Sequence, residues 1–175
     1  MKMILGICCF AFSHDGKFLY AAVIADIPAE NADITKLPAA TGRRDGFLWD
    51  FESIEFFFGG KDNQSYQFIL APDNRLYDAF SRPNGPKNSA VKWNSQKIEF
   101  NTVKGSTSWD GFLAIPLDEI KFGKGKTEEV FKFNAYRNCR YNFPNEPMTW
   151  EQSCYLPTFG GFYNTERFGT LRLGK

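Results

Sequence analysis

The stretch that decides the fold is residues 49–58, which read WDFESIEFFF. If this stretch is extended, successive side chains point to opposite faces, so Ile54, Phe56 and Phe58 share one face. The other face then carries Trp49, Ser53, Glu55 and Phe57. The first set suits a buried core. A carboxylate between apolar neighbours is costly to bury unless it is paired, so Glu55 faces solvent on a concave surface or has a fixed partner.

Strand-like segments of similar length continue along the chain. Their separators are rich in turn residues, for example Pro72-Asp73-Asn74 and Pro83-Asn84-Gly85-Pro86. Only residues 116–121 resemble a helix, and they span little more than one turn. This pattern predicts an all-β fold, namely an antiparallel β-sandwich of the jelly-roll type. The expected strands are residues 17–25, 52–58, 65–71, 75–80, 97–104, 108–115, 130–138 and 168–173.

Two long stretches, residues 27–48 and 139–162, lack a strand pattern and are expected to be irregular loops. Loops of this length are uncommon and often functional. Each ends at an aromatic residue, Trp49 or Phe162. Phe162 and Tyr163 follow Gly160-Gly161, so a flexible loop presents both rings just before the last strand. The two rings either form a binding surface or fold back onto the core.

Length and charge exclude several classes of protein. The 175 residues favour a single domain over 1–175. The 21 basic and 20 acidic residues give a net charge of +1, so nucleic acid is not an expected partner. No run approaches the roughly 20 apolar residues of a membrane span, so no membrane partner is expected. The apolar start of the chain imitates a signal peptide, but Asp15-Gly16 instead predicts a hairpin and a soluble chain without a signal peptide.

Cysteine and histidine are too sparse for a metal site. Cys8 and Cys9 are adjacent, so they would point to opposite faces of a strand, and His14 lies in a predicted turn. No metal site is therefore expected. Cys139 and Cys154 flank one loop and suit either a disulfide or two free thiols, and four cysteines allow three pairings.

Polar side chains line one face of the predicted strand over residues 130–138. Phe131, Phe133 and Ala135 form its apolar face, and Asn134, Tyr136 and Asn138 line the other. Gln67 adds an amide on another strand. Amides and phenols offer donors and acceptors without strong charge, which suits sugar hydroxyls. An ordinary polar sheet face is the alternative interpretation.

No catalytic constellation is found, so we expect a protein that is not an enzyme. Glu52 and Glu55 point to opposite faces and cannot form the facing carboxylate pair of a glycoside hydrolase. We find neither a nucleophile with its base nor a metal triad, and no catalytic residue is assigned. Carbohydrate binding is the leading hypothesis. The alternative is a structural or interaction sandwich, without sugar affinity, in a larger secreted glycan-active protein.

Four segments together resemble family 9 carbohydrate-binding modules and, more broadly, DOMON-like domains. They cover the chain from about Ile4 to Leu173, and their order is more specific than any one motif. The segments are Asp15–Ala22, Trp49–Phe57, Trp109–Leu117, and Asn134–Asn138 followed by Glu166–Leu171. The resemblance implies a non-catalytic module that binds oligo- or polysaccharides, with a sugar stacked between two aromatic rings in a groove on the sandwich.

The resemblance also implies roles for individual residues. Trp49 and Phe162 correspond to the two aromatic clamp positions, although the best-known binders carry Trp where this chain has Phe162. Ile69 replaces a basic contact residue of the family. Arg137 is a less certain contact, because strict alternation puts it on the other face. The expected carbohydrate-binding residues are Trp49, Glu55, Gln67, Tyr136, Arg137, Asn138, Phe162 and Tyr163.

The resemblance bears on setting and cofactors too. It implies an extracellular or periplasmic location and a catalytic domain in the parent protein, and the family's opening segment before Ile4 has no counterpart. The chain is then either a truncated module or a fragment of a larger enzyme. Family members can hold structural calcium, but no EF-hand spacing is present, so we expect solvated loop acids and no cofactor. The acids in question are Asp26, Glu30, Asp33, Asp45 and Asp50.

Overall fold

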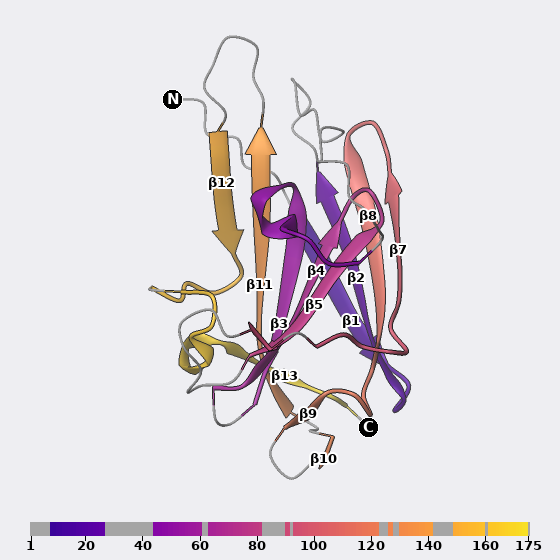
Figure 1. The fold of residues 1–175 in the computed structure, drawn as a ribbon, viewed down its shortest axis with the longest axis vertical. Helices are drawn as coiled ribbons and strands as arrows, with labels where there is room; N and C mark the ends of the chain where they lie inside the picture. Colours follow the sequence, from indigo (N-terminus) through magenta and orange to yellow (C-terminus); the bar gives the residue numbers. More distant parts are fainter. Residues whose placement is uncertain are drawn as a thin grey trace.

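The computed structural model describes residues 8–26, 44–60, 63–81, 90–91, 93–122, 126–127, 130–141, 149–159 and 161–174. These residues form two antiparallel β-sheets that pack face to face (Figure 1). One sheet has the order β1-β2-β8-β7 and the other β12-β11-β3-β4-β5-β6, with β13 also paired to β11. The predicted antiparallel sandwich is confirmed.

The strand boundaries agree closely with those expected from the sequence. The strands of the first sheet are β1 (Cys8–His14), β2 (Phe18–Asp26), β7 (Glu99–Lys104) and β8 (Ser108–Pro116). The second sheet contains β3 (Ser53–Gly59), β4 (Ser65–Ala71), β5 (Arg75–Ser81), β6 (Ala90–Val91), β11 (Val130–Tyr141), β12 (Thr149–Cys154) and β13 (Gly169–Arg172). A separate short pair is formed by β9 (Lys121–Phe122) and β10 (Lys126–Thr127), and the two 3-10 turns are η1 (Leu48–Asp50) and η2 (Thr165–Arg167).

The core lies between the sheets and follows the predicted alternation. Ile54, Phe56 and Phe58 of β3 are buried against Leu19, Leu113 and other residues of the opposite sheet. Phe131, Phe133 and Ala135 of β11 join the same cluster. Aromatic rings fill much of the space; Phe12 and Phe133, for example, meet edge to face with ring centroids 4.9 Å apart. This packing leaves the alternate residues of β3 and β11 on the outer face of the larger sheet.

The predicted hairpin at the start of the chain is confirmed. β1 and β2 pair from Cys8↔Ala25 to His14↔Leu19. Gly16 has φ +84, a left-handed conformation that glycine adopts without a Cβ penalty. The Asp15 carboxylate accepts hydrogen bonds from the backbone N–H groups of Lys17 and Phe18, both over 2.8 Å. The Tyr20 hydroxyl donates to the same carboxylate over 2.8 Å.

Two sequence predictions about local structure are wrong. Residues 139–162 are not one irregular loop, because β11 extends to Tyr141 and β12 spans Thr149–Cys154 beside it. β12 was missed because its polar residues show no strand pattern, and it forms only by pairing with β11. Residues 116–121 are not helical: β8 ends at Pro116, and a turn closed by Glu119 N–H to Pro116 O, over 3.1 Å, leads into β9. Of the predicted loop over residues 27–48, residues 27–43 lie outside the described part.

Candidate functional site

The candidate site lies on the outer face of the larger sheet, where strand pairing brings three predicted residues close together. Antiparallel pairing places Tyr136 of β11 opposite Glu55 of β3, and Glu55 opposite Ile69 of β4. The same row ends at Tyr77 of β5. The next row contains Gln67, which pairs with Phe57. Because strand side chains alternate, these residues share one face.

A continuous chain of hydrogen bonds crosses this face. Gln152 Nε2 donates to Asn138 Oδ1 over 2.7 Å, and Asn138 Nδ2 donates to Glu55 Oε1 over 2.5 Å. Gln67 Nε2 donates to Glu55 Oε2 over 2.8 Å, and the Tyr163 hydroxyl donates to Gln67 Oε1 over 2.9 Å. Glu55 therefore has the fixed partners that the sequence required of a buried carboxylate.

Glu55 sits at the centre of this chain and is nearly inaccessible, with 1% of its surface exposed. Burial raises the pKa of its carboxyl group, and the hydrogen bonds from Asn138 and Gln67 oppose that shift. Two amide donors to one carboxylate, without a cation, leave the pair of oxygens able to accept further hydrogen bonds. A neutral ligand with hydroxyl donors matches this arrangement better than an anion does.

Trp49 stands at one side of the polar chain, in η1. It packs with Tyr77 against a small apolar cluster that contains Leu48, Ile69 and Ala71. The rings of Trp49 and Tyr77 meet edge to face with centroids 5.3 Å apart. Ile69, where the family carries a basic residue, is fully buried in this cluster. η1 lies near the upper end of β3 in Figure 1 and contacts β3, β4 and β11. Trp49 remains half-buried.

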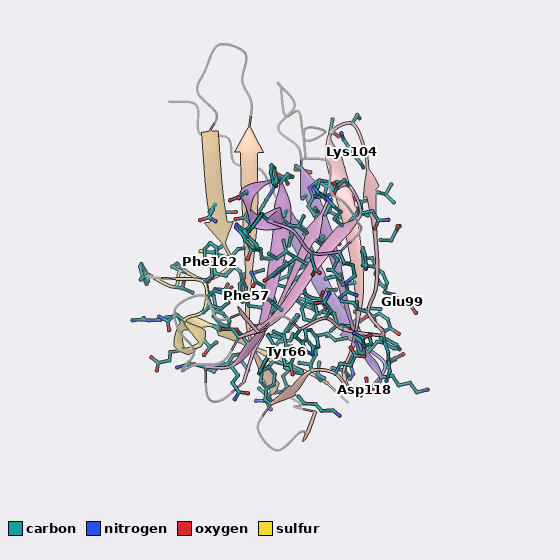
Figure 2. All side chains as sticks on the ribbon, viewed as in Figure 1. Phe57, Tyr66, Glu99, Lys104, Asp118 and Phe162 are labelled. Atoms are coloured by element: carbon teal, nitrogen blue, oxygen red, sulfur yellow. The ribbon has the colours of Figure 1, made fainter. Side chains whose placement is uncertain are left out.

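Phe162 stands at the other side, on the segment that precedes η2. It packs against a second apolar cluster formed by Phe57, Tyr136 and Phe168. Its ring centroid lies 4.4 Å from that of Tyr136 (Phe57 and Phe162 are labelled in Figure 2). Tyr163 contacts Phe57 edge to face at 5.4 Å and keeps 43% of its surface exposed. Glu55 thus has the Phe162 cluster on one side, through Tyr136, and the Trp49 cluster on the other, through Ile69.

Seven of the eight predicted site residues therefore share this face, and Arg137 does not. As alternation predicts, Arg137 points between the sheets, where its guanidinium pairs with Glu52 at 2.9 Å. Both side chains are 2% exposed. The indole N–H of Trp109 donates to the same Glu52 oxygen over 3.0 Å. Arg137 is an internal ion-pair residue that joins the sheets, and its assignment as a groove residue is wrong.

Sequence reasoning missed three residues of the site. Gln152 holds the Asn138 amide from β12, and it lay in the stretch predicted to be a loop. Thr158 accepts a hydrogen bond from the Tyr136 hydroxyl over 3.2 Å. Tyr77 extends the row of Glu55, and the alternation of residues 75–80 could have revealed it, because Leu76 and Phe80 mark the core face.

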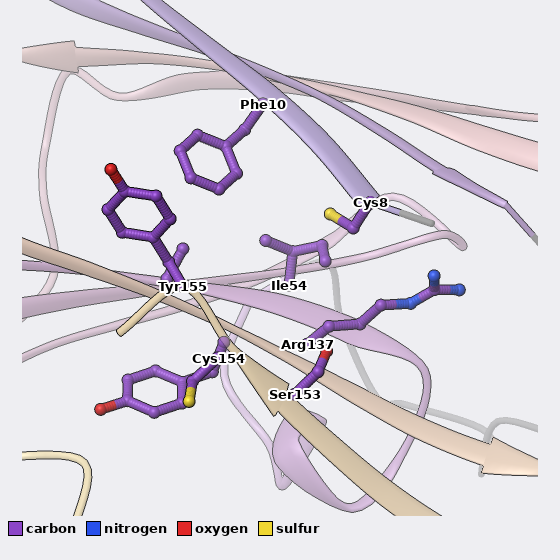
Figure 3. A pocket seen from close by; sticks show the side chains of 9 residues that line it. Cys8, Phe10, Ile54, Arg137, Ser153, Cys154 and Tyr155 are labelled. Atoms are coloured by element: carbon purple, nitrogen blue, oxygen red, sulfur yellow. The ribbon is translucent and has the colours of Figure 1, made fainter. Parts of the chain in front are cut away.

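A hollow of about 230 Å³ opens at the edge of the sandwich between β1 and β12 (Figure 3). Phe10, Ile54 and Tyr155 form apolar walls, and Cys8 lies at one end. Burial raises the pKa of the Cys8 thiol to about 11, so this thiol stays protonated at neutral pH and is a poor nucleophile. Tyr136, the residue that pairs with Glu55, also lines this hollow, but Glu55 itself and its hydrogen-bond partners do not.

The described residues hold neither a disulfide nor a clustered metal site. Cys8, Cys9, Cys139 and Cys154 are all free thiols. Cys139 pairs with Glu151 and Cys154 with Tyr136 across β11 and β12, so neither cysteine faces the other. No three His, Cys, Asp or Glu side chains of the described part gather as metal ligands. Glu30 and Asp33, two of the acids considered for calcium, lie outside that part. None of the described helical turns is long and apolar enough to span a membrane.

Comparison with known proteins identifies the architecture. No family model and no curated protein matches the sequence. A family 9 carbohydrate-binding module from Caldicellulosiruptor kristjanssonii, solved with cellotriose, matches 98% of this chain and 77% of its own, with a TM-score of 0.62 and 12% identity. The chain has a fold like that of family 9 carbohydrate-binding modules.

Two further structures agree with this fold. A protein from Bacteroides uniformis assigned as carbohydrate-binding matches 97% of this chain and 79% of its own, with a TM-score of 0.67 and 18% identity. A family 9 module from C. kristjanssonii in complex with glucose matches 99% of this chain and 79% of its own, with a TM-score of 0.61 and 11% identity. At these identities the likeness to family 9 modules concerns the fold.

Proposed function

We propose that the outer face of the larger sheet binds carbohydrate and catalyses no reaction. The observation that carries this proposal is the hydrogen-bonded chain from Gln152 to Tyr163, with an aromatic cluster on each side. A sugar ring has an apolar face for stacking and a rim of hydroxyls that both donate and accept. Aromatic residues with a few fixed polar groups are the usual composition of such sites.

In this proposal Trp49 and Phe162 are the stacking residues, and Glu55, Gln67 and Asn138 orient the sugar. When a ligand displaces Tyr163, Glu55 accepts hydrogen bonds from sugar hydroxyls and the second N–H of Gln67 donates to them. Asn138 acts by holding Glu55, because its other N–H donates to Ser53 Oγ over 3.2 Å. Tyr136 supports the ring of Phe162 from below. The Tyr163 hydroxyl donates a hydrogen bond to Gln67. A ligand would either displace the Tyr163 side chain or form a hydrogen bond with it. An amide or carboxylate left unpaired by a wrong sugar costs about 1–3 kcal/mol, which supplies specificity.

Three of the solved structures with this fold are carbohydrate-binding proteins by description, which supports the proposal. The family likeness also supports a secreted or periplasmic setting, with polysaccharide as the natural ligand and a catalytic domain in the same protein. A non-catalytic role fits the separation of the two candidate acids, because Glu52 is paired with Arg137 inside the sandwich and Glu55 lies on the outer face.

The test is a glycan array carrying cello-, xylo- and galacto-oligosaccharides, followed by titration of the best ligand. We expect saturable binding with micromolar or weaker affinity. Trp49→Ala should weaken it roughly fivefold, since one ring contact contributes about 1 kcal/mol. Phe112→Ala, which removes an exposed ring from the other sheet, should not. A wild-type chain that binds no glycan, or turnover of aryl glycosides that disappears in Glu55→Gln, would contradict the proposal.

A further inference from the structure

Phe47 is an exposed aromatic residue beside the candidate site that none of the preceding assignments uses. Its side chain keeps 71% of its surface accessible to solvent. Its ring meets Trp49 edge to face, with centroids 5.3 Å apart and an interplanar angle of 85°. Trp49 in turn contacts Tyr77 at the end of the Glu55 row. Phe47 thus continues the aromatic surface outward from the proposed clamp.

The backbone that presents Phe47 adopts two consecutive left-handed conformations. Asp45 has φ 69 and Gly46 has φ 103. A left-handed residue other than glycine is uncommon, and such conformations persist only where surrounding contacts determine them. Glycine suits position 46, because a side chain there would be strained although nothing lies within 4 Å of its Cβ position.

Contacts on both sides of this turn hold it in place. The backbone N–H of Asp45 donates to Leu76 O over 2.8 Å, and the Asn94 amide donates to the Asp45 carboxylate over 3.3 Å. Arg44, the preceding residue, forms an ion pair with the buried Asp78 and donates to Ser95 O over 3.0 Å. The chain is therefore fixed in a conformation that exposes the apolar ring of Phe47 to solvent. Such an arrangement stabilises neither the core nor the turn, and it suits a binding contact.

We infer that Phe47 is a third stacking residue, which extends the proposed binding site past Trp49 so that a sugar chain, and not only a single sugar, is bound. This inference rests on the proposed function. Because the rings of Phe47 and Trp49 are nearly perpendicular, they cannot both lie flat on one plane. The ligand that contacts both is a single glycan chain that turns between consecutive units. A flat crystalline polysaccharide surface does not fit both rings.

The test compares ligand lengths in wild type and variants by calorimetric titration. Glucose, cellobiose and cellotriose serve as probes, or the matching xylose series if the array selects xylan. For wild type we expect affinity to rise from the monosaccharide to the trisaccharide. Phe47→Ala should lower the affinity for the trisaccharide about two- to tenfold and leave the affinity for the monosaccharide unchanged. Phe47→Tyr should retain the gain, and Phe112→Ala should change nothing.

The outcomes separate the two proposals. If wild type binds no sugar of these series or of the array, the proposed function fails and this inference with it. If wild type binds but Phe47→Ala lowers the affinity for mono- and trisaccharide equally, or lowers neither, only the role of Phe47 is overturned. Thermal unfolding of each variant shows whether the fold is retained, and Phe47→Leu, which keeps an apolar side chain without a ring, should behave as Phe47→Ala does.

Discussion

At the scale of single residues, Glu55 joins the fold to the proposed function. Its two oxygens accept from Asn138 and Gln67, and those amides are themselves fixed by Gln152 and Tyr163. In Glu55→Gln one oxygen becomes a donor. The Asn138 amide cannot turn without losing Gln152, whereas Gln67 can turn, because the Tyr163 hydroxyl accepts as well as donates.

We predict that Glu55→Gln folds and binds sugar with altered preference. The variant should reverse the hydrogen bonds through Gln67 and Tyr163, so the donors and acceptors presented to the ligand change on that side. Profiles of wild type and variant on the same glycan array test this prediction. An unchanged profile would show that Glu55 does not contact the ligand.

Glu55 should also make stability depend on pH. Burial raises its folded pKa above the ordinary value of 4.5. The folded state therefore binds the proton more tightly than the unfolded state, and this contribution is full below about pH 4.5 and is lost as pH rises through the folded pKa. We expect the free energy of unfolding of Glu55→Gln, measured in urea relative to wild type, to be higher at pH 8 than at pH 4. Glu166→Gln, at an exposed position, is the control; a pH-independent difference would contradict the account.

The hairpin residue Asp15 should give stability the opposite dependence on pH. Hydrogen bonds from the backbone of Phe18 and Lys17, and from Tyr20, lower the pKa of its carboxyl group to about 2. Its contribution is present above pH 3.8 and is lost as pH falls through 2. Asp15→Ala should lower the melting temperature at pH 7, and the difference from wild type should shrink towards pH 2. Circular dichroism melts check this, and a constant difference would refute it.

At the scale of strands, Gly111 of β8 is packed closely against side chains of both sheets. A Cβ at this position would lie 2.6 Å from Leu70 Cδ2 and 2.8 Å from Val23 Cγ1. Gly111→Ala should therefore destabilise the fold by about 1–3 kcal/mol through overpacking. Gly174→Ala, with nothing within 4 Å, is the matched control. Equal urea midpoints for the two variants would show that the sheets are packed more loosely there.

The ion pair between Glu52 and Arg137 makes a second prediction for the strands. Arg137→Met leaves a buried carboxylate without its cation and should cost about 3–5 kcal/mol. The double variant Glu52→Gln/Arg137→Met should recover most of that loss, because it removes both charges and keeps an oxygen acceptor for the Trp109 indole N–H. Denaturant unfolding of the single and double variants checks this. Additive losses would show that the two side chains do not act as a pair.

Strand alternation predicted which residues share a face, because that property is local. It placed Phe56 in the core, separated Glu52 from Glu55, and put Arg137 opposite Tyr136. The sequence could not predict that β11 lies between β3 and β12, since those pairings join segments far apart in the chain. β12 was missed for the same reason: an edge strand with polar residues such as Gln152 has no apolar period, and only β11 defines it. The hydrogen-bond partner of Asn138 was therefore missed too.

At the scale of the whole molecule, the two sheets have different roles. Both sheets contribute one face to the core. In the larger sheet β3 and β4 are buried on both faces, and the outer face carries the polar chain of Glu55. The proposed stacking residues Trp49 and Phe162 lie on segments packed against that face. The tryptophans report on this difference. Trp109 is fully buried between the sheets and donates its indole N–H to Glu52, whereas Trp49 is half-buried at the groove.

The most direct test of the account is an NMR titration of the indole N–H signals with cellotriose, or with the trisaccharide that the array selects. The Trp49 signal, assigned by its loss in Trp49→Phe, should shift in a saturable way, and the Trp109 signal should stay in place. A Trp49 signal that does not move at ligand concentrations that saturate binding would show that the sugar binds elsewhere. The outer face of the larger sheet would then not be the binding site.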